Sequence, residues 1–295
     1  MSASTQTPNP AVTSSVRWAV LTAVAFAGFW LTYAAFVLTA PGQRIENAAL
    51  RGADQEDAAL VVESDAALNA ITVSSLGAVS LFVVLFALVR KRVDLAVAAA
   101  VVIVGSSVIT QVLKRFVLPR PELAEVTGPY ASNSFPSGHT AIAMSVLFAL
   151  LIVVPFAWRG LAMFLGAFYA IAIGAHTLTS KWHRFSDTLG ADLVALGVAC
   201  AVTVVLVKRG SLVRVRSGRY PLRVVFVVAP IAVGAAISLS LGALILVMGE
   251  HPTHPDEVLD YNMYLALHGL AAGASALTAL VFWWSWRRIA AVGPG

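Results

Sequence analysis

Three short polar clusters interrupt a mostly apolar sequence, and their residue types suit phosphoryl chemistry. The first contains Lys114 and Arg120, whose positive charges and hydrogen-bond donors match the oxygens of a phosphate group. The second is Pro-Ser-Gly-His at 136–139, and the third is Lys-Trp-His-Arg-Phe-Ser-Asp at 181–187. Each cluster lies at the end of a long apolar segment, so helix ends must bring the three together.

The second cluster has the pattern of a turn that opens a helix. Ser137 is a natural N-cap, and the free N–H groups of a helix start favour an anion. Gly138 would let the backbone approach a ligand closely, and His139 could then give a proton to a leaving group. A capped helix start with an interfacial histidine is the simpler alternative, and four residues do not decide between them.

The third cluster places His183 four residues before Asp187. On a helix the two would share a face, and a turn could also bring them together. A carboxylate that accepts a hydrogen bond from one imidazole nitrogen fixes the tautomer and leaves the other nitrogen free to act as a nucleophile. The alternative is an ion pair at a helix start, where an acidic residue is favoured in any case.

The elements that carry these clusters are predicted to be membrane helices. Hydrophobic residues make up 59% of the chain and charged residues 12%, against roughly 25% charged in soluble domains. Eight stretches approach the roughly 20 apolar residues that cross a bilayer, which predicts an all-α polytopic membrane helical bundle with about eight transmembrane helices. They are Trp18–Ala40, Ala66–Val89, Leu95–Leu113, Thr140–Trp158, Leu161–Thr179, Thr188–Val207, Val224–Met248 and Tyr264–Trp286.

The distribution of lysine and arginine predicts the orientation. With the N-terminus inside, most basic residues are cytoplasmic, and the acidic segments 46–65 and 250–260 are outside. Both termini are then cytoplasmic, and the three clusters face the outside of the cytoplasmic membrane. This topology accounts for the net charge of +5, so no nucleic-acid partner is implied.

The spans divide the chain into four expected parts. Residues 1–17 form a cytoplasmic tail, 18–207 a six-span core, 208–223 a basic cytoplasmic loop, and 224–295 two additional spans with a short tail. Within the core, the polar segment 41–65 is expected to form a short surface helix. A single cysteine, Cys200, excludes a disulfide framework.

Together the three clusters resemble the motifs of the type 2 phosphatidic acid phosphatase superfamily, membrane lipid phosphatases that share their site with vanadium haloperoxidases. Those motifs are K-x6-R-P, P-S-G-H and S-R-x5-H-x3-D, and the resemblance covers about residues 66–207. It implies that His183 is the nucleophile, that Asp187 orients it, and that His139 protonates the leaving group. Phosphate-binding groups would be Lys114, Arg120, Ser137 and the Gly138 backbone N–H.

The sequence departs from the superfamily pattern at two places. Five residues rather than six separate Lys114 from Arg120, and one deleted residue turns a helical side chain by about 100°. The Ser-Arg pair of the third motif would fall at 176–177, where the sequence has His-Thr. Lys181 and Arg184 are the candidate substitutes for the missing arginine.

The resemblance implies hydrolysis of a lipid phosphate or diphosphate, with no metal and no other cofactor. A polyprenyl diphosphate, phosphatidate and phosphatidylglycerol phosphate all remain candidate substrates, and the oligomeric state is not predicted. A catalytically silent relative that binds or moves a phospholipid is the alternative. A transporter is a third reading, although the spans lack the mid-membrane charges expected of one.

Other polar residues receive ordinary roles. His251 and His254 lack an evident third metal ligand, while His176 and His268 are expected to pack at the interface. Asp192 lies inside a span, where an acid is a candidate functional residue.

Overall fold

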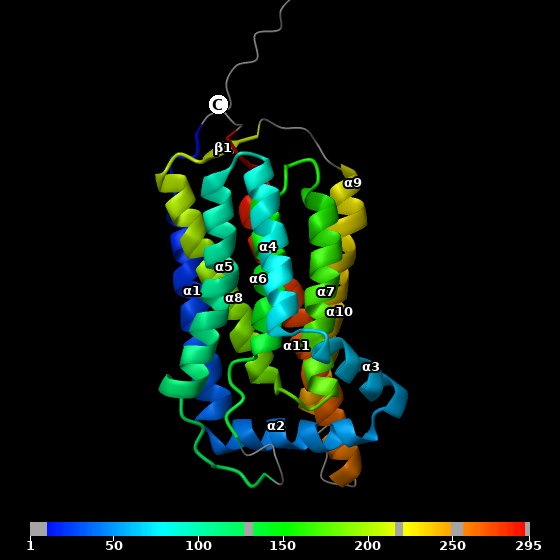
Figure 1. The fold of residues 1–295 in the computed structure, drawn as a ribbon. Helices are drawn as coiled ribbons and strands as arrows, with labels where there is room; N and C mark the ends of the chain where they lie inside the picture. The colour runs from blue at the N-terminus through cyan, green and yellow to red at the C-terminus, as the bar shows by residue number, and fades with distance from the viewer. Residues whose placement is uncertain (1–10, 127–131, 216–220, 249–255, 293–295) are drawn as a thin grey trace, which may run out of the picture.

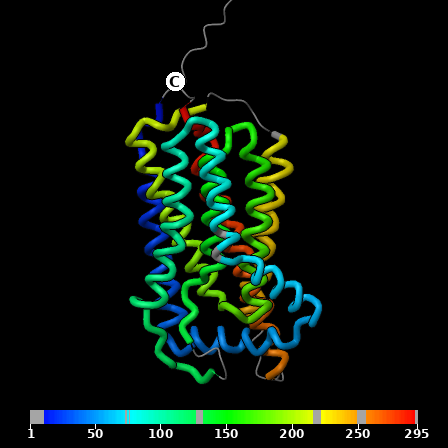
Figure 2. Tube along the Cα trace, viewed as in Figure 1, coloured from blue at the N-terminus to red at the C-terminus, as the bar shows by residue number. Residues whose placement is uncertain are grey.

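The computed structural model describes residues 11–126, 132–215, 221–248 and 256–292, which form a bundle of long helices (Figure 1). Among the described residues, six helices, with their π-helical extensions, are long and apolar enough to cross a membrane, and two shorter apolar helices run among them (Figure 2). The all-α membrane architecture predicted from composition is confirmed. The eight are α1 (Val16–Thr32), α4 (Val73–Val89), α5 (Val93–Val112), α6 (Gly138–Val153), α7 (Arg159–Thr179), α8 (Phe185–Lys208), α10 (Ala229–Met248) and α11 (Asp256–Trp286).

In the described part of the chain, three membrane helices carry a π-helical turn at one end. These wider turns are η1 (Tyr33–Val37) after α1, η3 (Leu113–Val117) after α5, and η5 (Val224–Val228) between α9 (Pro221–Arg223) and α10. A π-turn changes the direction in which the following side chains point. The turn η3 matters most, because it contains Lys114.

The segment between the first two spans folds into two surface helices rather than the single one expected. Helix α2 (Ala40–Gly52) lies across one end of the bundle and leads through η2 (Ala53–Gln55) into α3 (Ala58–Asn69) (Figure 1). The second span therefore begins at Val73 and not at Ala66. The boundary shifts because Thr72 and Ser75 form a reciprocal capping box that starts α4.

Helices α6 and α8 supply much of the interior. Met144, Leu147 and Phe148 on α6 are fully buried, and α8 is the most deeply buried of the six long apolar helices. Helix α11 begins eight residues before the predicted span and packs against α7, α8 and α2. The last helix is thus part of the packing around the site end.

A short antiparallel sheet closes the end of the bundle opposite α2. Strand β1 (Leu212–Arg214), within the segment expected to be a loop, pairs with β2 (Ile289–Ala291). Arg159 is buried beneath it and donates to the carbonyl oxygens of Trp286 and Ile289 at 3.2 and 2.6 Å. These bonds join the final residues of the described chain to the start of α7.

Candidate active site

The starts of α6 and α8 meet at the α2 end of the bundle and are joined by a backbone bond. The Ser137 N–H donates to the Asp187 carbonyl oxygen at 2.8 Å. Ser137 is the N-cap of α6, as predicted, and its hydroxyl oxygen accepts from the Thr140 N–H at 3.3 Å. The second and third polar clusters are therefore held together by their main chains.

His183 lies in the turn before α8, and Asp187 is the third residue of that helix. His183 Nδ1 is 3.3 Å from Asp187 Oδ2, and the same carboxylate oxygen accepts from the Arg184 N–H at 2.9 Å. The His183 N–H donates to the Thr177 carbonyl oxygen at 3.0 Å, which holds the turn against α7. The pair is thus formed by a turn and a helix start, not by one helical face.

Burial decides the protonation of His183. The side chain is 7% exposed, and burial lowers the pKa of its imidazole below the ordinary value, while the Asp187 carboxylate opposes that shift. Because the desolvation is the larger effect, the imidazole is neutral near pH 7. A neutral ring with Nδ1 held by a carboxylate presents a lone pair on Nε2, as a nucleophile requires.

His139 stands next to His183. The two ring centroids are 6.0 Å apart, and the His139 and Trp182 rings pack in a T-shaped arrangement with centroids 5.2 Å apart. His139 Nδ1 is buried and has no hydrogen-bond partner among the described residues. A second imidazole therefore lies within reach of an atom bound at His183.

Lys114 approaches the same histidines from the end of α5. Its charge interacts with Asp187, His139 and His183, although the side chain is only half-buried. Asn133 donates to the carbonyl oxygens of Lys114 and Leu118, at 3.1 and 2.7 Å, and fixes the end of the π-turn. Sequence reasoning missed Asn133, because an asparagine in a loop carries no pattern.

Arg120 is held by a residue that the sequence did not single out, Glu46 of α2. Arg120 Nη2 lies 3.3 Å from Glu46 Oε2, and Glu46 Oε1 accepts from the Ser186 N–H at 2.8 Å. Glu46 is 1% exposed, and burial, reinforced by the Asp187 charge, raises the pKa of its carboxyl group. Arg120 Nη1 is also buried and has no partner within the described part of the chain.

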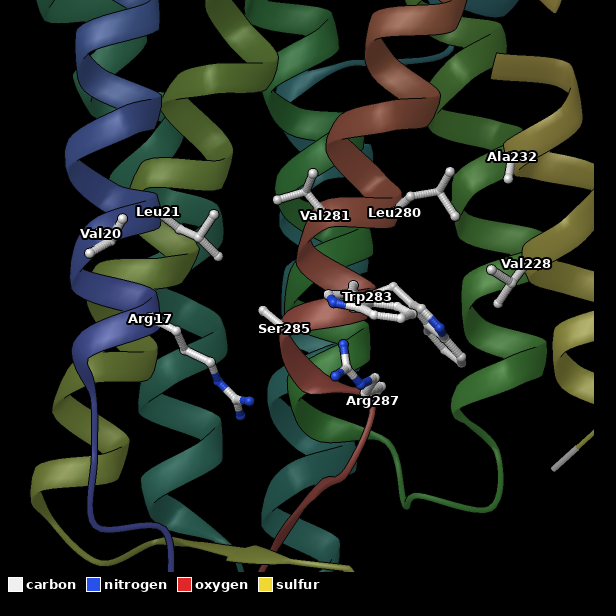
Figure 3. Close-up of a pocket in the computed structure, with 11 residues that line it drawn as sticks. Arg17, Val20, Leu21, Val228, Ala232, Leu280, Val281, Trp283, Ser285 and Arg287 are labelled. Carbon is white, nitrogen blue, oxygen red and sulfur yellow. The ribbon is translucent and has the colours of Figure 1, made fainter. Parts of the chain in front are cut away.

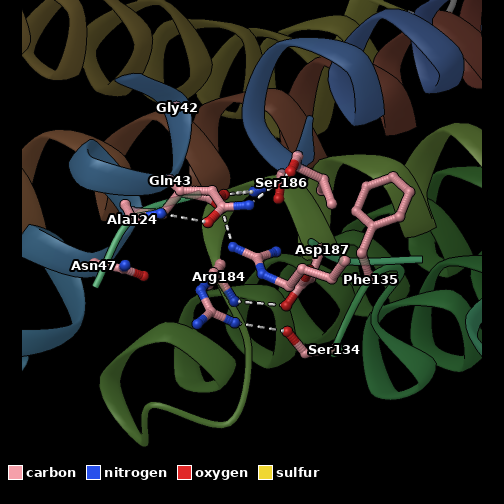
Figure 4. A network of polar contacts seen from close by, with 12 residues as sticks. Gly42, Gln43, Asn47, Ala124, Ser134, Phe135, Arg184, Ser186 and Asp187 are labelled. Carbon is pink, nitrogen blue, oxygen red and sulfur yellow. Dashed lines mark hydrogen bonds and ion pairs between the residues drawn. The ribbon is translucent and has the colours of Figure 1, made fainter. Parts of the chain in front are cut away.

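A second α2 side chain clamps the loop that carries Arg120 (Figure 4). Gln43 donates to the carbonyl oxygens of Val37 and Pro121, each at 2.7 Å. Its carbonyl oxygen accepts from the Leu123 and Ala124 N–H groups at 3.1 and 3.2 Å. The spacing of Gln43, Glu46 and Asn47 (i, i+3, i+4) is the signal that could have revealed this polar face of α2.

The two candidate substitutes for the missing arginine point in different directions. Arg184 Nη1 donates to Ser134 Oγ at 3.1 Å (Figure 4). The charge of Arg184 also interacts with Asp187, Arg120 and Glu46. Lys181 has a left-handed backbone, with φ of 58°, and its Nζ lies 2.5 Å from Asp54 Oδ1. The structure therefore brings Arg184 into the cluster and directs Lys181 toward η2.

Gly138 makes a close helix contact. A Cβ atom at this position would lie 3.1 Å from Gln111 Nε2 of α5, so a side chain would displace Gln111. The glycine thus allows the start of α6 to approach α5. Its N–H remains at the first turn of α6, where an anion is favoured.

The other polar residues singled out in the sequence and described by the structure lie apart from His139 and His183. Asp192 accepts from Ser275 Oγ at 2.6 Å deeper in the bundle, and His176 pairs with Ser64 of α3 at 2.8 Å. His268 packs on Tyr264, while His251 and His254 are outside the described residues. Within the described ranges, no group of three or more His, Cys, Asp and Glu residues is placed to hold a metal ion.

Comparison with known proteins identifies one family. The model of the PAP2 superfamily matches residues 93–211, a range that contains all three polar clusters and excludes α2. No curated protein and no solved structure matches the chain. The family match indicates phosphatase activity on phosphorylated lipids, without specifying which lipid.

Proposed function

We propose that the protein is a membrane phosphatase acting through a phosphohistidine, and the match of residues 93–211 to the PAP2 superfamily model supports this proposal. The substrate is a lipid phosphate or diphosphate. The observation that carries the proposal is the buried His183–Asp187 pair, which lies beside His139 where two helix starts are joined.

His183 Nε2 attacks phosphorus in the first step. The N–P bond forms while the bond to the leaving oxygen breaks, and His139 gives that oxygen a proton. Asp187 holds the Nδ1 proton of His183 and stabilises the positive charge that develops on the ring. In the second step His139 takes a proton from water, and the water oxygen attacks phosphorus. The new O–P bond forms as the N–P bond to His183 breaks, which releases inorganic phosphate and restores both histidines.

Three cations balance the charge on the transferred phosphoryl group. Lys114 and Arg184 interact electrostatically with the His183–Asp187 pair, and Arg120 has an unused buried donor in Nη1. Ser137 and the Gly138 N–H at the start of α6 add uncharged donors. We assign Arg184 the place of the arginine that the third motif lacks.

The lipid tail is proposed to reach the site from the membrane beside α5. Phe116 and Val117 follow Lys114 on η3 and are 81% and 51% exposed. Apolar side chains exposed next to a phosphate-binding lysine suit a substrate whose phosphate is polar and whose chain stays in the bilayer. Acyl and prenyl chains would pack equally well against this surface. Phosphatidate, phosphatidylglycerol phosphate and a polyprenyl diphosphate are therefore all candidate substrates.

The decisive experiment is phosphate release by the purified protein in detergent. Each of the three lipids is tested with and without EDTA, and His183→Ala serves as the matched inactive variant. Release that resists EDTA and requires His183 supports the proposal. Tight binding without release on any lipid would instead identify a catalytically silent phospholipid-binding relative.

The location of the site is a separate proposal. We place it on the outer face of the cytoplasmic membrane with both termini inside, on the basis of the charge distribution. A cysteine at Glu125 is expected to react with an impermeant thiol reagent in intact cells, and one at Arg209 is not. Native Cys200 is buried and does not compete; the reverse pattern would overturn the orientation.

A further inference from the structure

An apolar groove runs along the outside of the bundle at the end opposite α2. It has a volume of about 760 Å³, within the range of ligand sites. Helix α11 contributes Leu280, Val281 and Trp283, and the sides are formed by α1 on one side and η5 with α10 on the other (Figure 3). The groove therefore faces the region that the hydrocarbon of a bilayer occupies.

Arginines line one end of this groove. Arg17 from α1 and Arg287 after α11 both line it, and the charge of Arg17 interacts with Arg287 and with Arg214 of β1 (Figure 3). No carboxylate of the described residues forms an ion pair with any of the three. Like charges gathered without an acid repel one another, so this end is complementary to an anion.

Aromatic rings hold two of these guanidinium groups in place. Arg17 lies 3.9 Å from the centroid of the Trp18 ring, and Arg287 lies 3.6 Å from that of Trp284. Tryptophan and arginine together mark the level of lipid headgroups in membrane proteins. The apolar groove and its charged end are thus arranged in the same order as a lipid chain and its headgroup.

We propose that this groove binds an anionic glycerophospholipid of the leaflet opposite the active site. One acyl chain lies against α11 between α1 and α10, and the phosphate is bound by Arg17 and Arg287. The site is separate from the histidines, and its existence does not depend on the phosphatase activity.

Native mass spectrometry of the delipidated protein in detergent tests this directly. Phosphatidylglycerol is titrated as the probe, with phosphatidylcholine as the zwitterionic comparison. One phosphatidylglycerol molecule is expected to bind more tightly than phosphatidylcholine. The Arg17→Gln/Arg287→Gln double variant should weaken that binding about 25-fold, from about fivefold per arginine. Arg288→Gln is the matched control, since Arg288 is exposed and does not line the groove.

A second pair of variants tests whether the apolar part of the groove binds the acyl chain. These variants leave the charge of the protein unchanged. Ala232→Trp should fill the groove and reduce phosphatidylglycerol binding at least tenfold, whereas Val233→Trp, on an exposed residue outside the groove, should not. Glycerophosphoglycerol, the headgroup without its chains, should fail to compete. Equal binding of the two lipids, equal losses in test and control variants, or competition by the free headgroup would overturn the proposal.

Discussion

The two histidines and the two first-cluster cations of the proposed site are held in place by different means. The positions of His139 and His183 are fixed by main-chain hydrogen bonds at the starts of α6 and α8. These bonds lie inside the segment that matches the PAP2 superfamily. Lys114 and Arg120 depend on side chains, and the Arg120 partner, Glu46, comes from α2, outside that segment.

The motif spacing shows the same division. A main-chain bond between Ser137 and Asp187 needs only the correct backbone path, so the histidines keep their motif spacing. The cations reach the site through a π-turn and an extended loop, whose path is set by Gln43 and Asn133. Side chains from other parts of the chain can accommodate the shortened spacing between Lys114 and Arg120. For the same reason, the positions of these two cations should be sensitive to substitutions far from the first cluster.

The largest effect is expected from removing the nucleophile. His183→Ala should lower kcat about 10⁴-fold or more, because loss of a covalent nucleophile abolishes the two-step route. An acid-labile phosphoenzyme, trapped by rapid quenching with labelled substrate, should form only when His183 is present. His176→Ala is the control, since His176 bonds to Ser64 of α3 and contacts neither His139 nor His183 among the described ring and ion-pair contacts. Near-normal turnover by His183→Ala would exclude the covalent mechanism.

A smaller loss, with a shifted pH profile, is expected from Asp187→Asn. The carboxylate raises the pKa of His183 against the lowering caused by burial, so its removal lowers that pKa further. In the proposed mechanism neutral His183 is the reactive form, so the acid limb of kcat/KM should lie below pH 6.5 in the wild type and at still lower pH in the variant. The plateau should fall about 10³-fold because the tautomer is no longer fixed. An acid limb that moves upward would contradict this assignment.

Arg184→Ala should reduce kcat/KM about 10²-fold, as the loss of one oxyanion donor does. Lys181→Ala should stay within about fivefold of wild type, since its partner Asp54 is 65% exposed and such ion pairs contribute little. Steady-state kinetics of both variants on one lipid phosphate compare the two directly. The opposite ranking would give Lys181 the place of the missing arginine.

Among the variants of the clustered side chains, Glu46→Gln should have the smallest effect, a loss of about tenfold in kcat/KM that comes mostly through KM. The amide oxygen can still accept from the Ser186 N–H, but the charge that holds Arg120 is lost. Glu63→Gln removes the same charge from an exposed position on α3 and serves as the control. A fall in KM would show instead that Glu46 competes with phosphate for Arg120.

The sequence by itself determined the membrane class, the eight apolar segments and the clusters at their ends. Hydrophobic length is a local property, since each span must cover the bilayer with its own residues. The role of Ser137 as an N-cap was also predictable from the sequence, because an N-cap side chain hydrogen-bonds within the first turn of its own helix. Span boundaries were less secure, as the capping box at Thr72 shows.

Only the tertiary structure decided which polar side chains meet. The position of α2 across the bundle end, which brings Glu46 to Arg120, depends on packing between segments 74 residues apart. The left-handed backbone of Lys181, in the turn before α8, accompanies its pairing with Asp54, whereas Arg184 bonds to Ser134 within the cluster. Thr177, where the motif resemblance would place arginine, is fully buried and hydrogen-bonded to Gly174 and Thr188. Side-chain direction in loops and packing between distant helices leave no local periodic pattern in the sequence. For that reason they were determined only by the tertiary structure.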